Sequence, residues 1–281
     1  MKTVASLPLY EELINNFESR IQLEIDVFSD KRKDGIESFK RLGFPTRRNE
    51  DWKYTGVSTF LNDQFNTVDF LDAQVDEDDL KQFCIPEMDC YKFVVLNGKL
   101  FHHDEELPSF IKLKSINEVN DDSRVERKFG SVTNIDSPFA ALNTALFSDG
   151  FYLEIEAGAI LEKPLHIIHL FKTLESAFVQ PRNLIVIGKG ASISIIESYI
   201  SETNQVKLFI NNLVEVIANE NSFVDHYILE TLKSGSRLVN QTDVSVARSC
   251  VYNNYTFSLP GAEFIRNNLN VNLDSSSTEA H

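Results

Sequence analysis

Two histidines three residues apart, His166 and His169, have side chains that could bind a metal ion. Imidazole nitrogens are common ligands of zinc and other transition metals. The pair lies in the apolar run PLHIIHLF, which has the composition of a β-strand. Successive side chains of a strand point to opposite faces, so positions three apart cannot reach the same ion. We therefore expect two half-buried strand histidines rather than a metal site.

Three cysteines, Cys84, Cys90 and Cys250, could bind a soft metal or carry sulfur as a persulfide. They form no CxxC pair, and the spacing of Cys84 and Cys90 suits no standard zinc site. Cys250 follows a turn at the start of an expected strand, where a small buried residue is the more common role. An odd number of cysteines fits a reducing compartment, so we expect a cytoplasmic protein.

Asp225, His226 and Glu230 have the residue types of an acid–base pair. They lie in the strand-like run FVDHYILETL. Adjacent strand residues point to opposite faces, so Asp225 and His226 are poorly placed to act together. The GKG turn at 188–190 lacks the spacing of a phosphate-binding loop. We therefore expect no catalytic site.

A compact block, PTRRNEDWKYTGVSTFLND, contains the only tryptophan of the chain. Its candidate site residues are Arg47, Arg48, Glu50 and Trp52. One interpretation is a partner surface, in which Trp52 is the anchor and the arginines make charged contacts. The other is a structural lock, in which Trp52 is buried against the N-terminal helices and Glu50 pairs with an arginine. Both interpretations are open.

The composition limits both the fold and the function. A chain of 281 residues with 42% apolar residues and 21 Phe can bury a large core. Its 42 acidic and 27 basic residues give a formal charge of −15, which argues against nucleic-acid binding along the phosphate backbone. No apolar run approaches the roughly 18 residues that span a bilayer, so we expect no membrane segment.

The sequence predicts that residues 1–150 form a mixed, largely helical region with one short hairpin. Apolar residues recur at helical spacing from Pro8 to about Gly43, which indicates two helices. The run YKFVVLNGKLF predicts a hairpin with Asn97-Gly98 at its turn. The run SPFAALNTALFSDG predicts a further helix that ends before Gly150.

Residues 151–281 differ, because strand-like runs follow one another with short polar breaks and no helical pattern. Turns at Gly188, Ala218 and Ala247 begin 30 and 29 residues apart. A near-constant period of this size predicts stacked coils that share an apolar row. We predict a fold that is mainly β with an N-terminal α region, in which a right-handed parallel β-helix forms the core. A β-sandwich with evenly spaced turns is the alternative.

The predicted stack has no cap at its C-terminal end. His281 follows a turn in the middle of a repeat, and an uncovered coil exposes unpaired backbone groups. We therefore expect that the β-helix core, residues 151–281, is incomplete at its C-terminal end and that the chain is truncated. An open end also favours edge-to-edge pairing of two copies into a homodimer.

Several separated stretches resemble the SufB/SufD family of iron–sulfur cluster assembly proteins, and its SufD branch more than its SufB branch. The N-terminal block is similar to a SufD motif through Pro45, Arg47, Arg48, Glu50, Trp52, Lys53 and Tyr54. Further similar stretches follow in the family's order, and they cover almost the whole chain: VVLNGKLF, FAALNTALFSDGFYLEIEAGAILEKPLHI, QPRNLIVIGKGASISIIESY and NNLVEVIANENSFVDHYILE.

The resemblance implies a scaffold subunit that is not itself an enzyme, in a complex of SufB, SufC and SufD. A SufB-like subunit would bind through the β-helix, and the SufC-like ATPase would bind a C-terminal domain that is absent here. The resemblance also implies a transient iron–sulfur cluster in the full complex and no tightly bound cofactor in this chain. The family's His and Cys positions at the cluster interface lie in the missing late region, so none is assigned to a residue here.

A second hypothesis is a β-helix enzyme that acts on polysaccharide. Such enzymes are usually exported, and they line a groove with acidic and basic catalytic residues. The sequence shows neither a secretion signal nor such a set of residues. We therefore favour the scaffold hypothesis.

Overall fold

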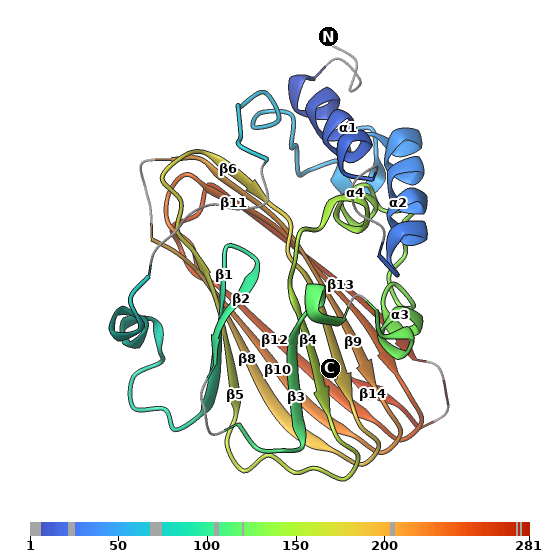
Figure 1. Ribbon diagram of the computed structural model, residues 1–281, viewed down its shortest axis with the longest axis vertical. Coiled ribbons are helices and arrows are strands. Elements are labelled where there is room, and N and C mark those ends of the chain that lie inside the picture. The colour runs from blue at the N-terminus through green and yellow to red at the C-terminus, as the bar shows by residue number, and fades with distance from the viewer. Residues whose placement is uncertain are drawn as a thin grey trace.

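The computed structural model of the chain describes residues 7–21, 26–67, 75–103, 107–119, 121–202, 206–273, 275 and 277–281. A group of helices lies beside a stack of β-strands (Figure 1). The stack is a parallel β-solenoid of about four turns, in which each turn adds a strand to each of two sheets. This confirms the predicted fold class, mainly β with an N-terminal α region.

The first sheet contains β1 (Tyr91–Leu96), β2 (Lys99–His103), β5 (Leu165–Phe171), β8 (Ser192–Ser201), β10 (Phe223–Thr231), β12 (Val251–Ser258) and β14 (Glu279–Ala280). Their order is β14-β12-β10-β8-β5-β1-β2. All neighbours are parallel except β1 and β2. The β1–β2 turn has left-handed backbone at Asn97 and Gly98, as the predicted Asn-Gly hairpin requires.

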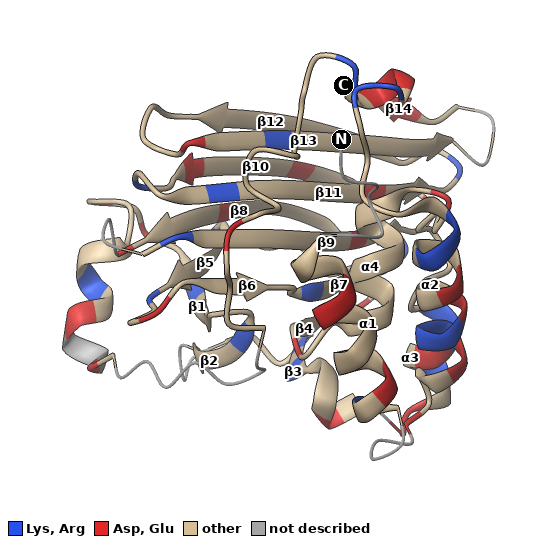
Figure 2. Cartoon of the chain, turned by 90° about the horizontal axis from the view of Figure 1, so that it is seen from above, with Lys and Arg blue, Asp and Glu red and all other residues tan. Residues whose placement is uncertain are grey.

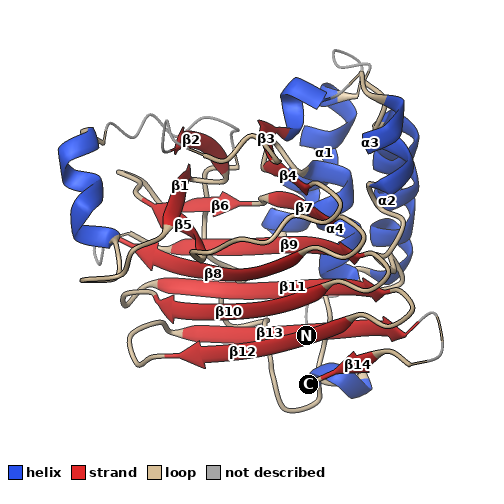
Figure 3. Ribbon diagram, turned by 90° about the horizontal axis from the view of Figure 1, so that it is seen from below, coloured by secondary structure: helices blue, strands red, loops and turns tan. Residues whose placement is uncertain are grey.

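The second sheet contains β3 (Ile111–Ser115), β4 (Phe151–Ile155), β7 (Arg182–Ile187), β9 (Leu208–Ala218), β11 (Ser236–Val246) and β13 (Phe264–Leu273). Their order is β13-β11-β9-β7-β4-β3, and the short β6 (Ala177–Val179) pairs with β9. Only β3 and β4 are antiparallel. Figure 3 shows these strands stacked in layers, with α1 to α4 to one side.

One set of turns repeats the same backbone geometry along the solenoid. A left-handed residue stands in successive turns at Gly158, Gly190, Asn221, Ser249 and Ser277. Neighbouring turns also bond to each other, since the amide of Gly188 donates to the carbonyl oxygen of Ile155 at 2.8 Å. The near-constant period of the sequence therefore reflects coils in close backbone contact.

Apolar side chains fill the solenoid interior. Alternate residues of each strand point inward, and stacked coils bring their inward rows together. The largest part of this core combines residues of both sheets, among them Phe93, Phe151, Ile167, Ile185, Ile195, Val214, Val224, Val244 and Tyr252. Figure 2 shows that charged residues are frequent on helices α2 and α3 and sparse along the strands.

The N-terminal region covers the outer face of the second sheet. Its main helices are α1 (Pro8–Arg20), α2 (Ser29–Leu42) and α4 (Pro138–Leu146), and the first two confirm the predicted helix pair. These helices form an apolar cluster with Phe209 of β9 and Val239 of β11. Helices α2 and α4 are in close contact, because a Cβ at Gly35 would lie 2.9 Å from the carbonyl oxygen of Ala141.

Short helical elements complete this region: η2 (Glu50–Trp52), η3 (Glu77–Phe83), η4 (Ile116–Val119) and α3 (Ser123–Lys128). Strands β1 and β3 lie before residue 150 but belong to the two solenoid sheets. The division of the chain at residue 150 stays a prediction. Within the described residues, no helix has the length and apolarity needed to cross a bilayer.

Candidate functional site

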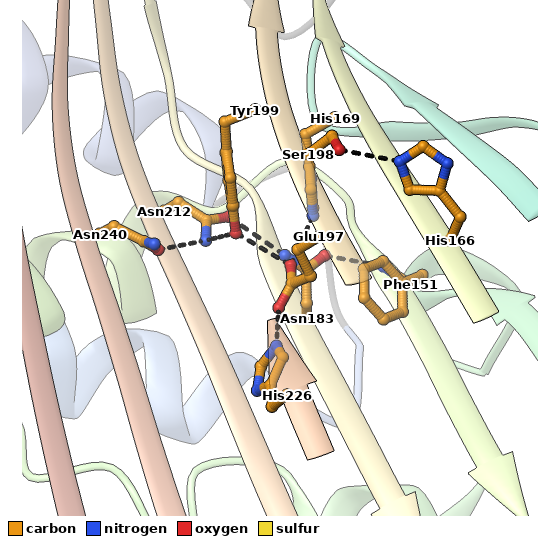
Figure 4. Close-up of polar contacts among 10 residues, drawn as sticks. All are labelled: Phe151, His166, His169, Asn183, Glu197, Ser198, Tyr199, Asn212, His226 and Asn240. Atoms are coloured by element: carbon orange, nitrogen blue, oxygen red, sulfur yellow. Dashed lines mark hydrogen bonds and ion pairs between the residues drawn. The ribbon is translucent and has the colours of Figure 1, made fainter. Parts of the chain in front are cut away.

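A fully buried carboxylate, Glu197 of β8, lies inside the solenoid and interacts with three side chains (Figure 4). Its Oε2 lies 2.6 Å from Nε2 of His169 on β5 and accepts a 2.9 Å hydrogen bond from the hydroxyl of Tyr199. Its Oε1 lies 2.7 Å from Nε2 of His226 on β10. Three stacked strands therefore place two imidazoles and one phenol around a single carboxylate.

The hydrogen bonds define where the protons of this cluster lie. An ionised Glu197 only accepts, so both Nε2 atoms must donate. Nδ1 of His226 lies 2.7 Å from the hydroxyl of Tyr252 on β12. Nδ1 of His169 is buried and has no hydrogen-bond partner among the residues that the structure describes. Nε2 of each histidine therefore carries a proton that is directed at Glu197.

The surroundings of Glu197 favour its ionised form. Burial by itself would raise the pKa of Glu197, but the hydrogen bonds from His169 and His226 outweigh it and hold this pKa well below its usual range. Burial and the charge of Glu197 raise the pKa of Tyr199 well above its ordinary value. The Tyr199 ring stacks on His169 with a centroid distance of 4.3 Å, which fixes the imidazole orientation.

A row of asparagines connects this cluster to the opposite sheet. Asn212 of β9 donates to the Tyr199 hydroxyl at 2.9 Å and to Oδ1 of Asn240 at 2.8 Å. Asn183 of β7 donates to Oδ1 of Asn212 at 3.1 Å and accepts from the amide of Phe151. The polar network therefore crosses the interior from one sheet to the other (Figure 4).

Chemically, the network surrounds an ionised carboxylate with hydrogen-bond donors in a buried site. Glu197, His169, His226 and Tyr199 are all 0% exposed, so a substrate could reach them only if the coils opened. Among the described residues, no group of three or more His, Cys, Asp and Glu side chains could hold a metal ion. Buried charges of this kind fix the relative positions of the strands that carry them.

The structure separates His166 from His169, as their spacing predicts. Nε2 of His166 lies 2.8 Å from the hydroxyl of Ser198, whereas His169 contacts Glu197 in the interior. The expectation of half-buried side chains is wrong, because both histidines are fully buried. The outer face of β5 is covered, since its Ile168 and Leu170 pack against residues 75–84 and β1. Burial and the nearby charge of Lys92 lower the pKa of His166 to about 4.

The predicted divergence of Asp225 and His226 is confirmed. Asp225 accepts from Asn253, whereas His226 points into the interior toward Glu197. Glu230 is also buried, and it accepts hydrogen bonds from Ser258 and Asn267 instead of joining that pair. Burial raises the pKa of Glu230.

The cysteines lie apart from the Glu197 cluster. Cys250 is fully buried and accepts a hydrogen bond from Ser222, and burial raises the pKa of its thiol. A raised thiol pKa disfavours the reactive thiolate, so the geometry suits a small buried coil residue. Cys84 and Cys90 are half-buried, and neither forms a disulfide.

The four candidate residues of the tryptophan block have different surroundings. Trp52 is 5% exposed and packs on Phe139 in the N-terminal core. Arg47, Arg48 and Glu50 are exposed. Within the part of the chain that the structure describes, no ion pair joins Glu50 to either arginine. The choice between a partner surface and a structural lock stays a prediction.

Sequence reasoning missed Glu197, Tyr199 and Tyr252 as interacting residues. The sequence did contain a signal for Glu197. In the strand SISIIESYIS every second residue from Ile193 points to the same face, and this series is Ile193, Ile195, Glu197 and Tyr199. That alternation places the carboxylate inside the protein. Its histidine partners come from other coils, and the register of those coils is not visible in the sequence.

Comparisons with known proteins agree with this architecture. Residues 6–167 match the SufBD protein N-terminal region, and residues 169–281 match the SufBD core domain of SUF system FeS cluster assembly. The chain therefore belongs to the SufBD family of iron–sulfur cluster assembly proteins, as the sequence motifs predict.

Individual relatives are distant but similar over most of this chain. An iron–sulfur cluster assembly SufBD family protein of Synechocystis is 26% identical over 272 residues, which cover 91% of this chain and 59% of the relative. SufD of Escherichia coli is 22% identical over 277 residues, which cover 96% of this chain and 62% of the relative. SufD of Bacillus subtilis is 28% identical over 95 residues, 34% of this chain and 22% of the relative. The chain thus spans 59% and 62% of the length of the first two relatives.

Proposed function

We propose that this chain is a scaffold subunit of a SUF complex that assembles iron–sulfur clusters, with the role that SufD has beside SufB and SufC. The observation that carries the proposal is the match to both SufBD regions in order, over residues 6–281. Similarity to SufD of Escherichia coli over 96% of the chain favours the SufD role. The complex would act in the cytoplasm, and this subunit would not itself be an enzyme.

The cluster would be transient cargo of the complex, not a resident cofactor of this chain. The SufB-like subunit would bind along the β-solenoid, whose stacked strands offer a long and rigid surface. The SufC-like ATPase would bind a C-terminal domain outside these 281 residues. The buried network around Glu197 supports such a role, because it fixes the coils that would carry the partner surface.

A paired pull-down tests this proposal. One bait is the 281-residue chain, and the other extends into the reading frame that follows His281; both are offered SufB and SufC homologues from the same genome. We expect both baits to retain the SufB homologue and only the longer bait to retain the SufC homologue. Failure of both baits to retain either partner would contradict the proposal.

A spectroscopic test addresses the cargo. Because the cluster belongs to the assembled complex, the 281-residue chain purified without oxygen should show no iron–sulfur absorption. The reconstituted complex should acquire it when iron, a sulfur source and ATP are supplied. Hydrolysis of a pectin-like polymer by the purified chain would instead favour the polysaccharide enzyme.

A further inference from the structure

A second glutamate of the solenoid interior, Glu230 of β10, is 0% exposed. Its Oε2 accepts hydrogen bonds from the hydroxyl of Ser258 on β12 and, at 3.1 Å, from the side-chain amide of Asn267 on β13. The amide side chain of Asn240 on β11 also lies next to it. Four consecutive strands of the last coils therefore meet at one carboxyl group.

The surroundings of this carboxyl group suit its neutral form. Within the described residues, Oε1 of Glu230 is buried and has no hydrogen-bond partner. A carboxylate that leaves water without paired or donating groups is costly, so such a group tends to keep its proton instead. A proton on Oε2 would find an acceptor, because the hydroxyl of Ser258 can accept as well as donate. The protonated acid therefore fits this site better than the anion does.

The strands packed around Glu230 bring no positive charge to it. From β8 it is faced by Tyr199, its partner in the strand register, and this phenol is neutral because its pKa lies well above the ordinary value. On β10 itself, the next titratable group of the interior face is His226, whose Nε2 is directed at Glu197. Strands β11, β12 and β13 contribute the amides and the hydroxyl already described. Burial raises the pKa of Glu230, and only neutral hydrogen-bond donors oppose this effect.

Two other glutamates are also 0% exposed, and both have the donors that an anion needs. Glu197 lies between two imidazoles. Glu215 of β9 pairs with Arg182 and accepts hydrogen bonds from three backbone amides of residues 130–133. Glu230 has no comparable set. We propose that Glu230 is a protonated carboxylic acid in the folded protein and that it forms a pH-sensitive latch, whose ionisation weakens the last coil.

The latch has a defined direction with pH. Below the ordinary pKa of glutamate, the folded and the unfolded chain both hold the proton, so Glu230 contributes no pH dependence. Above it, the unfolded chain loses the proton first and binds fewer protons than the folded protein. The free energy of unfolding therefore decreases as the pH rises toward the pKa of the folded state. Once Glu230 is ionised, water can reach Oε1 only if β12 and β13 move away from it.

Infrared titration of the 281-residue chain measures the protonation state directly, because a carboxylic acid and a carboxylate absorb at different frequencies. Subtracting the spectrum of Glu230→Gln from that of the unchanged protein isolates this one side chain. We expect its acid band to remain at pH values at which a glutamate in an unstructured peptide has lost its own. Glu220→Gln is the matched control and should reveal a carboxylate at those pH values, because Glu220 pairs with Lys189 at the surface.

Urea unfolding at several pH values tests the latch. Glutamine has the shape of the protonated acid and cannot ionise, so Glu230→Gln should unfold at a higher urea concentration than the unchanged protein as the pH rises. The difference should shrink as the pH falls. His166 is present in both proteins, so its own titration cancels in the comparison. Ser258→Ala, at an exposed position, is a second variant: it removes the acceptor of the proton and should shift the frequency of the acid band.

Two results would overturn the proposal. The first is a carboxylate band for Glu230 at every pH at which the peptide glutamate is ionised. The second is a Glu230→Gln variant that is less stable than the unchanged protein at the higher pH values, as the loss of a hydrogen-bonded anion would predict. If this variant does not fold, an acid band that stays in place in Ser258→Ala has the same meaning. None of these experiments involves SufB or SufC, so the proposed scaffold function is tested separately.

Discussion

At the scale of single residues, Glu197 shows how a charge is kept inside an apolar solenoid. Its two oxygens accept hydrogen bonds from His169, Tyr199 and His226, so the cost of removing the carboxylate from water is offset by directed donors. The donors come from three different strands. A change at this one position therefore affects the alignment of several coils.

Glu197→Gln should destabilise the protein strongly. The amide group of glutamine would present a donor to one of the two histidines, which already donates, so one buried bond becomes a donor–donor contact. We expect the free energy of unfolding to fall by about 3 kcal/mol, as for other broken buried pairs. Urea unfolding followed by fluorescence measures this loss. Glu220→Gln, in an exposed pair with Lys189, is the control and should change stability far less. Equal losses would contradict the central role of Glu197.

His166 should make the free energy of unfolding depend on pH between pH 7 and pH 5. Its pKa is about 4 in the folded protein and 6.5 ordinarily, so the unfolded chain binds more protons in this interval. The free energy of unfolding therefore has its full value above pH 6.5 and decreases as the pH falls toward 4. From pH 7 to pH 5 we expect a loss of about 2 kcal/mol from this group. His166→Asn should remove that part of the slope in urea unfolding at the two pH values.

Ser198→Ala is the matched control for this pH dependence. It removes the hydroxyl that His166 contacts but keeps the titrating imidazole. The variant should be less stable at both pH values. The change in its free energy of unfolding between pH 7 and pH 5 should equal that of the unchanged protein. A slope that persists in His166→Asn would assign the pH dependence to another group.

At the scale of elements, the repeated turns fix the stacking of the coils. The turn at residues 188–191 contains two glycines with different constraints. A Cβ at Gly188 would lie 2.5 Å from the backbone nitrogen of Ala157 in the preceding coil, so the two turns are in direct backbone contact. Gly190 has left-handed backbone, but a Cβ there would meet nothing within 4 Å.

These two glycines predict different costs for the same substitution. Gly190→Ala should lose about 1 kcal/mol of stability, the cost of a left-handed L-residue. Gly188→Ala should lose clearly more, about 3 kcal/mol, because the preceding turn must move. Chemical denaturation of both variants measures the difference. A similar loss for both would show that backbone conformation, not coil contact, limits this turn.

At the scale of the whole molecule, the end of the solenoid exposes large apolar side chains. Phe257, Leu259, Leu269 and Leu273 of the last coil are between 46% and 54% exposed. Strand β13 forms the edge of its sheet, with β11 as its one neighbour in the sheet order. Edge strands with exposed apolar residues favour pairing with another chain.

We expect the 281-residue chain to self-associate through this end. Light scattering over a range of concentrations should show a dimer that dissociates on dilution. Leu269→Lys should shift the equilibrium toward the monomer, because it adds charge to the exposed edge. Leu174→Lys, at an exposed leucine outside the last coil, is the control and should leave the dimer intact. A monomer at the highest concentrations would contradict this pairing.

The sequence by itself determined the class of fold and the family. Helical spacing located α1, α2 and α4, and Asn97-Gly98 located the β1–β2 turn, because these signals depend on near neighbours in the chain. The turns at Gly188, Ala218 and Ala247 gave the period of the solenoid, since each coil must return to the same position above the last. The motifs around Trp52 and along the strands identified the SufBD family.

Only the tertiary structure decided which residues form the buried network. His169, Glu197 and His226 are nearly thirty residues apart from one to the next, and their contact depends on the register between coils. The same holds for the contact of Asp243 with Asn270 and for the contact of Trp52 with Arg266. Register and packing are set by all the stacked side chains together, so no local pattern in the sequence specifies them.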